Sequence, residues 1–575
     1  MPLTQFACAA GVPGTPAASY DDVVAIDGDL TRARHLVLAG DDEAARDLLL
    51  SLTPADDRET LEITAQLGDV HLARGANDAV AECIRRLEAL LAGAPPDLVR
   101  RYRPRARLLD IGLAAARGDH EHAAAELAAL AGDDHDPDHD PDHTRLVTHA
   151  RILCAGALCD DDLHVRSVPL WEQVVSQIHA GGADTTETDF LLVTGALGYG
   201  RFCVETGLLP EAEPWLRRAG ARAHVRGWNI ATARAALERA AAAWTAGDHE
   251  ATERLAAEAL PVLDAHGRAD DTARCHLYLG FTRMAIGELA VADEHWAHAE
   301  ASFRQLGKPL RLHRILLQRS WILIFWGRYA EATELIAQAR EQLDASPRSN
   351  WLQYARLDDH LGTVWRADAL ADLGFDAAGD PDDTLEDVEE KHVASLGVIR
   401  GTPAEENERS ARRKLEQAAE LMIPAALAVD SVRYAIPDAQ ARMRWAAAVS
   451  APLLAGAFAV AWEWENTALV AELIEYHSAR GAFTATPELG GSGMPDLATT
   501  SVPLHEVDEL AVQLAEVAGG SGAAPGSPSL TRLAPLPPLV MDPAGAPILD
   551  HYRTLAAQRY GREVAANEPA WSTWP

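Results

Sequence analysis

Cysteine is scarce and unpatterned in this chain. The 575 residues include six cysteines, and no two of them stand in a CxxC pair. Such spacing favours neither a disulfide framework nor a zinc site, so reduced thiols are expected. The first residues, MPLTQFACAAGVPG, also lack the basic stretch of a signal peptide. We therefore expect a cytoplasmic protein with no metal and no cofactor.

Positive charge and aromatic side chains are also in short supply. The formal net charge is −35, and aromatic residues make up 6% of the chain. A surface this acidic repels nucleic acid and anionic lipid as a whole. The best candidate for a membrane span, residues 445–462, is rich in alanine and contains Pro452 and Gly456. This composition favours a helix buried in protein over one in a bilayer. We expect neither a nucleic-acid nor a membrane partner.

The usual signatures of catalysis are missing as well. The sequence contains no glycine-rich phosphate loop, no HExxH and no cysteine after Cys275. Tyr476, His477 and Ser478 stand side by side, but adjacent positions on a helix point about 100° apart. No G-x-S-x-G motif surrounds Ser478, and Gly481 marks the end of a helix. We predict a helix end here and no catalytic residue; an enzyme with an unrecognised site is the remaining alternative.

A period of 40 residues runs from about residue 190 to residue 350. Glycine recurs along it, a small residue precedes each glycine by seven positions, and alanine follows each by twelve. The glycines are Gly207, Gly247, Gly287 and Gly327, and the small residues are Gly200, Ala240, Gly280 and Ser320. Self-similarity at a fixed period is typical of a solenoid. Because glycine readily takes the left-handed conformation at which helices end, each unit is predicted to be a helical hairpin that stacks on its neighbours.

Two stretches, residues 287–299 (GELAVADEHWAHA) and 327–339 (GRYAEATELIAQA), resemble tetratricopeptide repeats (TPRs). A period of 40 residues instead of about 34 implies longer helices than is usual in that family. Weaker copies of the pattern occur further upstream, around Gly40, Gly75 and Gly118. We therefore predict an all-α protein with a TPR-like solenoid over residues 30–375, preceded by an N-terminal cap or arm, 1–29.

In TPR proteins the first helix of each hairpin lines a concave groove, and the resemblance implies the same here. One column of that helix holds arginine in three of its four copies. A leucine column follows it, and the column after that mixes arginine and alanine with aromatic residues. The candidate groove residues are Arg234, Arg274, Arg314, Arg201, Phe281 and Trp321. Guanidinium groups pair with carboxylates and stack on aromatic rings, so an acidic, partly apolar peptide would fit. Alternatively, these arginines pair with acidic residues of neighbouring repeats, and the leucines beside them are core.

Two acidic stretches interrupt the helical pattern. In residues 133–143 (DDHDPDHDPDH), histidines recur every fourth position at His135, His139 and His143. Their prolines preclude a regular helix, which favours a solvated loop over a metal-binding face. Residues 376–404 are rich in Asp and Glu and are predicted to be an acidic linker that ends the array.

The C-terminal part is predicted to hold three segments. These are a helical domain over 405–485, a flexible Pro/Gly/Ser-rich linker with one short amphipathic docking helix over 486–545, and a terminal helix and tail over 546–575. Trp571 and Trp574 in the tail are candidate anchors for a partner. The alternative is that the tail packs back on the helical body.

Residues 415–481 and 535–561 resemble actinobacterial proteins that join TPRs to caspase-like (CHAT) proteases in conflict systems. This chain has no C-terminal cysteine, so the protease dyad is absent and no protease activity is implied. The resemblance implies a non-enzymatic scaffold, adaptor or sensor that binds and regulates a separately encoded caspase-like protease in antiviral defence. The alternative is a peptide-sensing TPR regulator that acts with a transcription factor.

Overall fold

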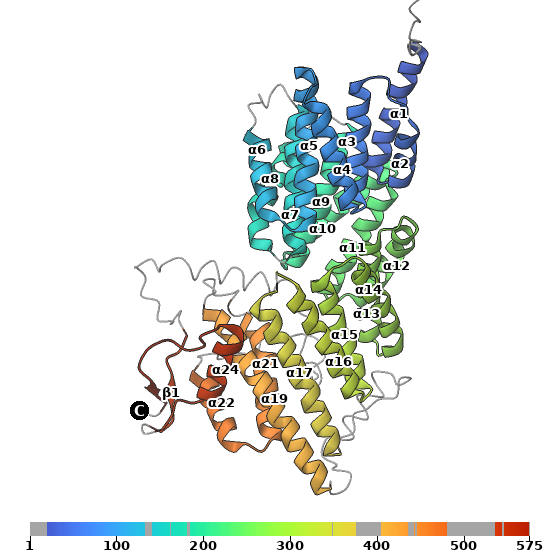
Figure 1. The fold of residues 1–575 in the computed structure, drawn as a ribbon. Helices are drawn as coiled ribbons and strands as arrows, with labels where there is room; N and C mark the ends of the chain where they lie inside the picture. The colour runs from blue at the N-terminus through green and yellow to red at the C-terminus, as the bar shows by residue number, and fades with distance from the viewer. Residues whose placement is uncertain are drawn as a thin grey trace, which may run out of the picture. The chain divides into compact units, whose positions relative to one another are not determined.

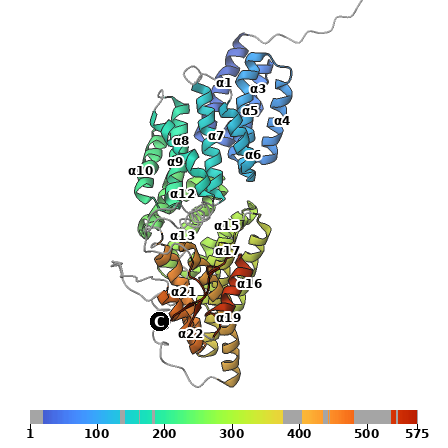
Figure 2. The ribbon, with the colours of Figure 1, turned by 90° about the vertical axis from the view of Figure 1, so that its left-hand side faces the viewer.

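The structure is a computed structural model of the chain (Figures 1 and 2). It divides into two units, one of residues 1–157 with 176–192 and one of residues 158–175 with 193–575. Helices α7, α8 and α9 contribute residues to both units. The residues whose backbone the structure describes are 20–132, 141–161, 163–180, 185–347, 349–374, 404–434, 442, 445–479, 535–542 and 545–573.

The first unit consists of consecutive helices that pack in pairs. Its helices are α1 (Tyr20–Ala39), α2 (Asp42–Ser51), α3 (Asp57–Ala73), α4 (Asn77–Leu91), α5 (Pro96–Arg117) and α6 (His120–Gly132), with parts of α7 (Pro141–Asp160), α8 (His164–Ala180) and α9 (Thr186–Glu205). Gly75 and Gly118 have positive φ and end α3 and α5. The weak upstream copies of the repeat are therefore helical hairpins too.

The 40-residue period builds the hairpins of the second unit. They are formed by α9 with α10 (Leu209–Arg226), α11 (Asn229–Thr245) with α12 (His249–Ala265), α13 (Ala269–Ala285) with α14 (Leu289–Gln305), and α15 (Pro309–Phe325) with α16 (Tyr329–Ala345). The glycines at 207, 247, 287 and 327 all have φ between 66° and 82°. This is the left-handed conformation expected of a helix stop. The chain is thus an all-α, TPR-like helical-repeat protein.

The small residues of the repeat lie where paired helices touch. A Cβ atom added to Gly280 would collide with the indole of Trp296 on the partner helix, and one added to Gly200 would collide with Leu216. Ala240 and Ser320 at the equivalent positions are fully buried. The column therefore keeps the two helices of each hairpin in close contact, as the spacing predicted.

The helix that follows the α15–α16 hairpin joins the array to a second core. Helix α17 (Trp351–Asp372) begins with a capping box at Asn350 and packs along α19 (Glu405–Ser431). Around α19 lie α21 (Ala451–Glu463), α22 (Thr467–Ala479) and α24 (Asp550–Tyr560) (Figure 1). Between α19 and α21 the chain forms the 3-10 turn η1 (Val432–Tyr434) and the π-helical turn η2 (Ala446–Ser450). Two short parallel strands, β1 (Leu539–Val540) and β2 (Trp571–Ser572), pair beside them.

The apolar run at 445–462 belongs to this second core. Trp445, Leu454 and Val460 are buried among residues of α19 and α22. In the part of the chain that the structure describes, no helix has the length and apolar character needed to cross a bilayer. Most of the predicted cap, the acidic linker and the Pro/Gly/Ser-rich linker lie outside the described residues, as do His135, His139 and Trp574.

Candidate functional site

A pocket of about 200 Å³ opens in the array of the second unit. Apart from Phe303 of α14, its walls come from α9, α11, α13, α15 and α17, the first helix of each successive hairpin. Stacking brings together side chains that are about 40 residues apart in the chain. Five of the six groove residues predicted from the sequence line it: Arg201, Arg274, Phe281, Arg314 and Trp321.

The sixth, Arg234, is not among the lining residues. Its Nε donates a hydrogen bond of 2.7 Å to Asp271 of the next repeat. Arg274 makes a similar link in the other direction, with two bonds of 2.5 and 2.7 Å to Glu238. Here the alternative interpretation, pairing with acids of neighbouring repeats, describes what these arginines do. Arg274 combines both roles because it also faces the pocket.

Positive charge dominates the polar lining. Five arginines line the pocket against two carboxylates, Glu205 and Glu238. The arginines are Arg201, Arg274, Arg311, Arg314 and Arg356. In a chain of net charge −35, this is a local reversal of sign. Low-dielectric walls focus such a field on whatever enters.

Asp160 holds one end of the pocket together. Its Oδ1 forms an ion pair with Arg201 at 2.9 Å and accepts a hydrogen bond of 3.0 Å from Arg311, although Arg311 is 151 residues away in sequence. Burial opposes ionisation of Asp160, but the two guanidinium groups hold its pKa well below the usual range. The carboxylate is therefore charged and offsets part of the positive charge of the pocket.

An aromatic and aliphatic surface lies beside the arginines. The rings of Trp244 and Phe281 stack with centroids 4.9 Å apart, and Trp321 contacts His360 edge-on at 4.5 Å. Leu277 and Leu317, from the leucine column of the repeat, also line the pocket. Burial lowers the pKa of His360 to about 3, so this imidazole is neutral at physiological pH. The pocket thus offers charge and apolar area side by side.

The sequence analysis did not identify several of the lining residues, although the repeat pattern could have revealed one of them, Arg356. Arg314 is the sixth residue of α15, and Arg356 is the sixth residue of α17. The arginine column therefore continues into α17, displaced by two residues because α17 begins 42 positions after α15. A strict spacing of 40 residues therefore misses Arg356. Trp244 and Arg311 occupy positions that carry no repeated residue type.

The remaining candidates lie elsewhere. Tyr476 donates a hydrogen bond of 2.8 Å to Asp430 inside the second core, and His477 contacts Phe458 edge-on. The predicted helix end at Tyr476–Ser478 thus serves packing. Trp571 lies in β2 and is 48% exposed.

One group of side chains at the edge of the pocket has the character of metal ligands. Glu205 lines the pocket and adjoins Cys159 and His164. All three are buried. No short-spacing motif marks this group, because Glu205 follows His164 by 41 positions.

No protein-family model and no curated protein matches the chain. Among solved structures, the chain is similar to the crystal structure of a Rap protein complexed with competence and sporulation factor. The two share 11% sequence identity with a TM-score of 0.41, over 68% of this chain and 99% of that one. A likeness this distant assigns no ligand and no partner to this chain.

Proposed function

We propose that this chain is a non-enzymatic, cytoplasmic interaction protein whose pocket binds an acidic, partly apolar peptide segment. The observation that carries the proposal is the lining itself, five arginines beside an aromatic surface. A carboxylate gains about 1.5–3 kcal/mol from each charge-assisted hydrogen bond it makes. An aromatic or aliphatic side chain adds the burial of its own surface.

The charge count supports an acidic ligand even after internal pairing. The lining residues carry an excess of three positive charges, and the excess is two once Asp160 is counted. Asp270 adds a further negative charge near Arg311. A ligand with one or two carboxylates would balance the remainder. A basic ligand would meet the opposite field.

The direct test is fluorescence anisotropy with three labelled peptides of equal length and the full chain. The first peptide mixes Asp and Glu with Phe and Leu, the second replaces Asp and Glu by Asn and Gln, and the third replaces them by Lys. We expect binding of the first alone. The double variant Arg314→Glu, Arg356→Glu should weaken it by at least roughly tenfold, because one lost charge-assisted bond already accounts for that factor.

Arg217→Glu is the matched control. Arg217 lies on α10, outside the pocket lining, with a side chain 69% exposed. It makes the same change of charge without touching the pocket, so binding should not change. Equal binding of all three peptides, or equal loss in both variants, would show that the pocket is not a carboxylate site.

A second proposal concerns the core around α19. We propose that it docks a separately encoded partner protein, a caspase-like protease, and that the chain acts as its scaffold or sensor. The two segments that carry the resemblance, 415–481 and 535–561, pack into this one core where the structure describes them. Trp462 on α21 and Ile474 on α22 are 73% and 50% exposed. Contiguous exposed apolar surface marks an interaction site, and we propose these two side chains as part of one.

Helix α17 connects the two proposed sites. Arg356 and His360 line the pocket, whereas Leu352 and Ala355 belong to the core around α19. Asp358 on the same helix accepts a hydrogen bond of 2.7 Å from Tyr560 of α24. A ligand that binds α17 therefore acts on an element of the docking core as well.

The partner can be identified by affinity purification of the tagged full chain from its native cells, followed by mass spectrometry. We expect a caspase-like protease to remain bound, and to be lost from the double variant Trp462→Glu, Ile474→Glu. Val225→Glu is the control, because Val225 is 77% exposed on α10. Recovery of a transcription factor instead would support the alternative regulator.

A further inference from the structure

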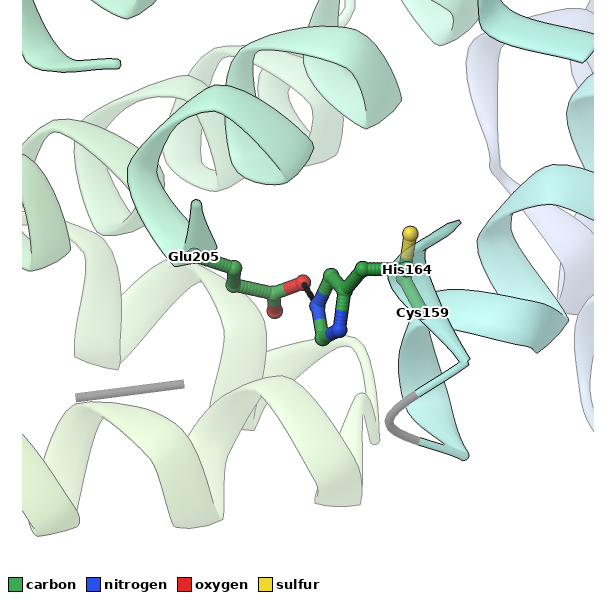
Figure 3. A group of neighbouring side chains, drawn as sticks. All are labelled: Cys159, His164 and Glu205. Carbon is green, nitrogen blue, oxygen red and sulfur yellow. Dashed lines mark hydrogen bonds and ion pairs between the residues drawn. The ribbon is translucent and has the colours of Figure 1, made fainter. Parts of the chain in front are cut away.

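Three chemically different metal-ligating side chains meet where three helix ends come together. Cys159 lies in the last turn of α7, His164 begins α8 and Glu205 ends α9. In Figure 3 the imidazole of His164 points at the carboxylate of Glu205, and Cys159 comes from the same turn as His164. The Nε2 atom of His164 lies 2.9 Å from Oε2 of Glu205. The three potential ligand atoms all lie within 4.8 Å of one another.

We propose that Cys159, His164 and Glu205 form a zinc site. Zinc binds thiolate sulfur, imidazole nitrogen and carboxylate oxygen at about 2.0–2.3 Å, so its ligand atoms lie roughly 3–4 Å apart. Small shifts of these side chains would bring all three to that separation. Calcium and magnesium prefer sites made of oxygen atoms, and the thiol makes this one unsuitable for them.

The surroundings fit the needs of the ligands. Ligating carboxylates are usually fixed by a further hydrogen bond. Arg201 supplies it, with Nε 2.5 Å from Oε1 of Glu205, and leaves Oε2 directed at His164. In the metal-free protein the thiol of Cys159 donates a hydrogen bond of 3.5 Å to Oγ of Ser167. Glu205 and Cys159 are therefore both held in place before a metal binds.

The charges and protons balance. In the metal-free protein burial raises the pKa of the Cys159 thiol, so the sulfur carries its proton. Binding of Zn²⁺ forms the Zn–S bond and releases that proton to solvent. Nε2 of His164, which donates to Glu205 in the metal-free protein, gives up its proton to bind the ion, and Nδ1 takes one up, so the imidazole stays neutral. One thiolate and one carboxylate then neutralise the ion. The charge of Arg201 is matched by Asp160 at 2.9 Å.

Three protein ligands leave a fourth position open. Glu205 is a lining residue of the pocket, so water or a carboxylate from a pocket ligand can reach that side of the ion. Zinc would also fasten α7, α8 and α9 to each other at one wall of the pocket. This inference does not depend on the peptide proposal, because the ligands and their geometry are the same whatever the pocket holds.

The test is a titration of the full chain with Co²⁺ after chelator treatment, read by absorption. Cobalt bound by a thiolate gives an intense sulfur-to-metal charge-transfer band, which histidine or carboxylate ligands do not give. We expect one band that saturates at stoichiometric cobalt and disappears when Zn²⁺ is added. Its absence in the unmutated protein would overturn the proposal without any substitution.

Variants then assign the ligands. Cys159→Ser should remove the charge-transfer band, and His164→Gln should weaken binding of both metals by at least an order of magnitude. Cys275→Ser is the control, because Cys275 is equally buried but lies outside the cluster. Circular dichroism confirms that each variant folds. A band that persists in Cys159→Ser, or one lost in Cys275→Ser, places the thiolate elsewhere and refutes the site.

Histidines outside the proposed site can also bind metal, and the assay separates them. His276 and His295 approach each other with Nδ1 atoms 3.0 Å apart, and His298 stacks on His276. Metal held there would change metal content without a charge-transfer band. Metal content that falls only when histidines of that group are replaced would contradict the proposed site.

Discussion

The buried ion pair between Glu238 and Arg274 gives a sharp test of how adjacent repeats are held together. Glu238 is 6% exposed and Arg274 is 5% exposed, and two hydrogen bonds of 2.5 and 2.7 Å between them link α11 to α13. Burial opposes the charge on Arg274, but Glu238 raises its pKa well above the usual value. Replacing Glu238 by Leu leaves a buried, uncompensated guanidinium. The expected loss is about 3–5 kcal/mol in the free energy of unfolding.

The matching double variant, Glu238→Leu with Arg274→Met, should recover most of that loss. Apolar residues of similar volume commonly replace a buried pair at little cost. Arg274 also stabilises the charge of Asp271 and repels Arg201. Replacing Arg274 removes both interactions, and their effects on the free energy of unfolding have opposite signs. We therefore expect a coupling energy of about 3 kcal/mol in the double-mutant cycle.

The assay is urea denaturation followed by tryptophan fluorescence. Arg217→Ala is the control, since its exposed pair with Glu213 should contribute under about 0.5 kcal/mol. If Glu238→Leu costs no more than this control, or if the double variant is no more stable than the single one, the pair does not hold α11 and α13 together.

Three further predictions concern stability. Gly280→Ala should lower the free energy of unfolding by about 1–3 kcal/mol, because the new methyl group meets Trp296. Gly156→Ala should raise it by roughly 0.5–1 kcal/mol, because no atom lies within 4 Å of the added Cβ. The midpoints of urea denaturation report both changes. Burial raises the pKa of Glu62, but Arg105 lowers it further, to about 2 against 4.5 in the unfolded chain. The first unit should therefore lose stability as pH falls from 4.5 toward 2. Glu62→Gln should flatten this pH dependence while lowering stability at neutral pH. Burial lowers the pKa of His276 from 6.5 to about 4, so its contribution is present above pH 6.5 and lost as pH falls toward 4; thermal melts of His276→Asn should show a shallower acid slope, and an unchanged slope would contradict the assignment.

Local chemistry explains why the array was predictable. Each hairpin repeats the same requirements, a left-handed glycine after the first helix and a small residue at the closest approach. Gly207 and Gly280 satisfy one requirement each, and both recur in step with the period. Such needs are set within one repeat and its neighbour, so they show directly as columns in the sequence.

The pocket was only partly predictable because its composition depends on exact helix starts. Arg314 follows from the 40-residue count, but Arg356 requires knowing that α17 begins two residues late, after the capping box at Asn350. The pairing of Arg234 with Asp271 shows the opposite difficulty. A residue in the correct column can turn toward a neighbouring repeat, and side-chain direction is not encoded by spacing alone.

The cluster of Cys159, His164 and Glu205 lay beyond sequence reasoning for a different reason. Metal motifs are recognised by short spacing, such as two cysteines three positions apart. Here only Cys159 and His164 are near in sequence, and Glu205 joins them because α9 packs against the α7–α8 turn. No periodic pattern records that contact. A site assembled from three helix ends is visible only once the helices are placed.

If the pocket binds an acidic peptide as proposed, the location of the arginines explains how an acidic chain selects it. The chain has a net charge of −35, and water screens the charges that lie on exposed surfaces. The arginines of the pocket lie among Trp244, Phe281 and Trp321, where screening is weaker. Arg201 and Arg274 are anchored by acids that belong to the fold, which fixes their positions before a ligand arrives. The long-range field of the protein therefore opposes an acidic peptide, while the short-range field of the pocket favours it. Added salt should screen the long-range repulsion more than the attraction inside the pocket. Binding of the acidic peptide should therefore weaken little as ionic strength rises.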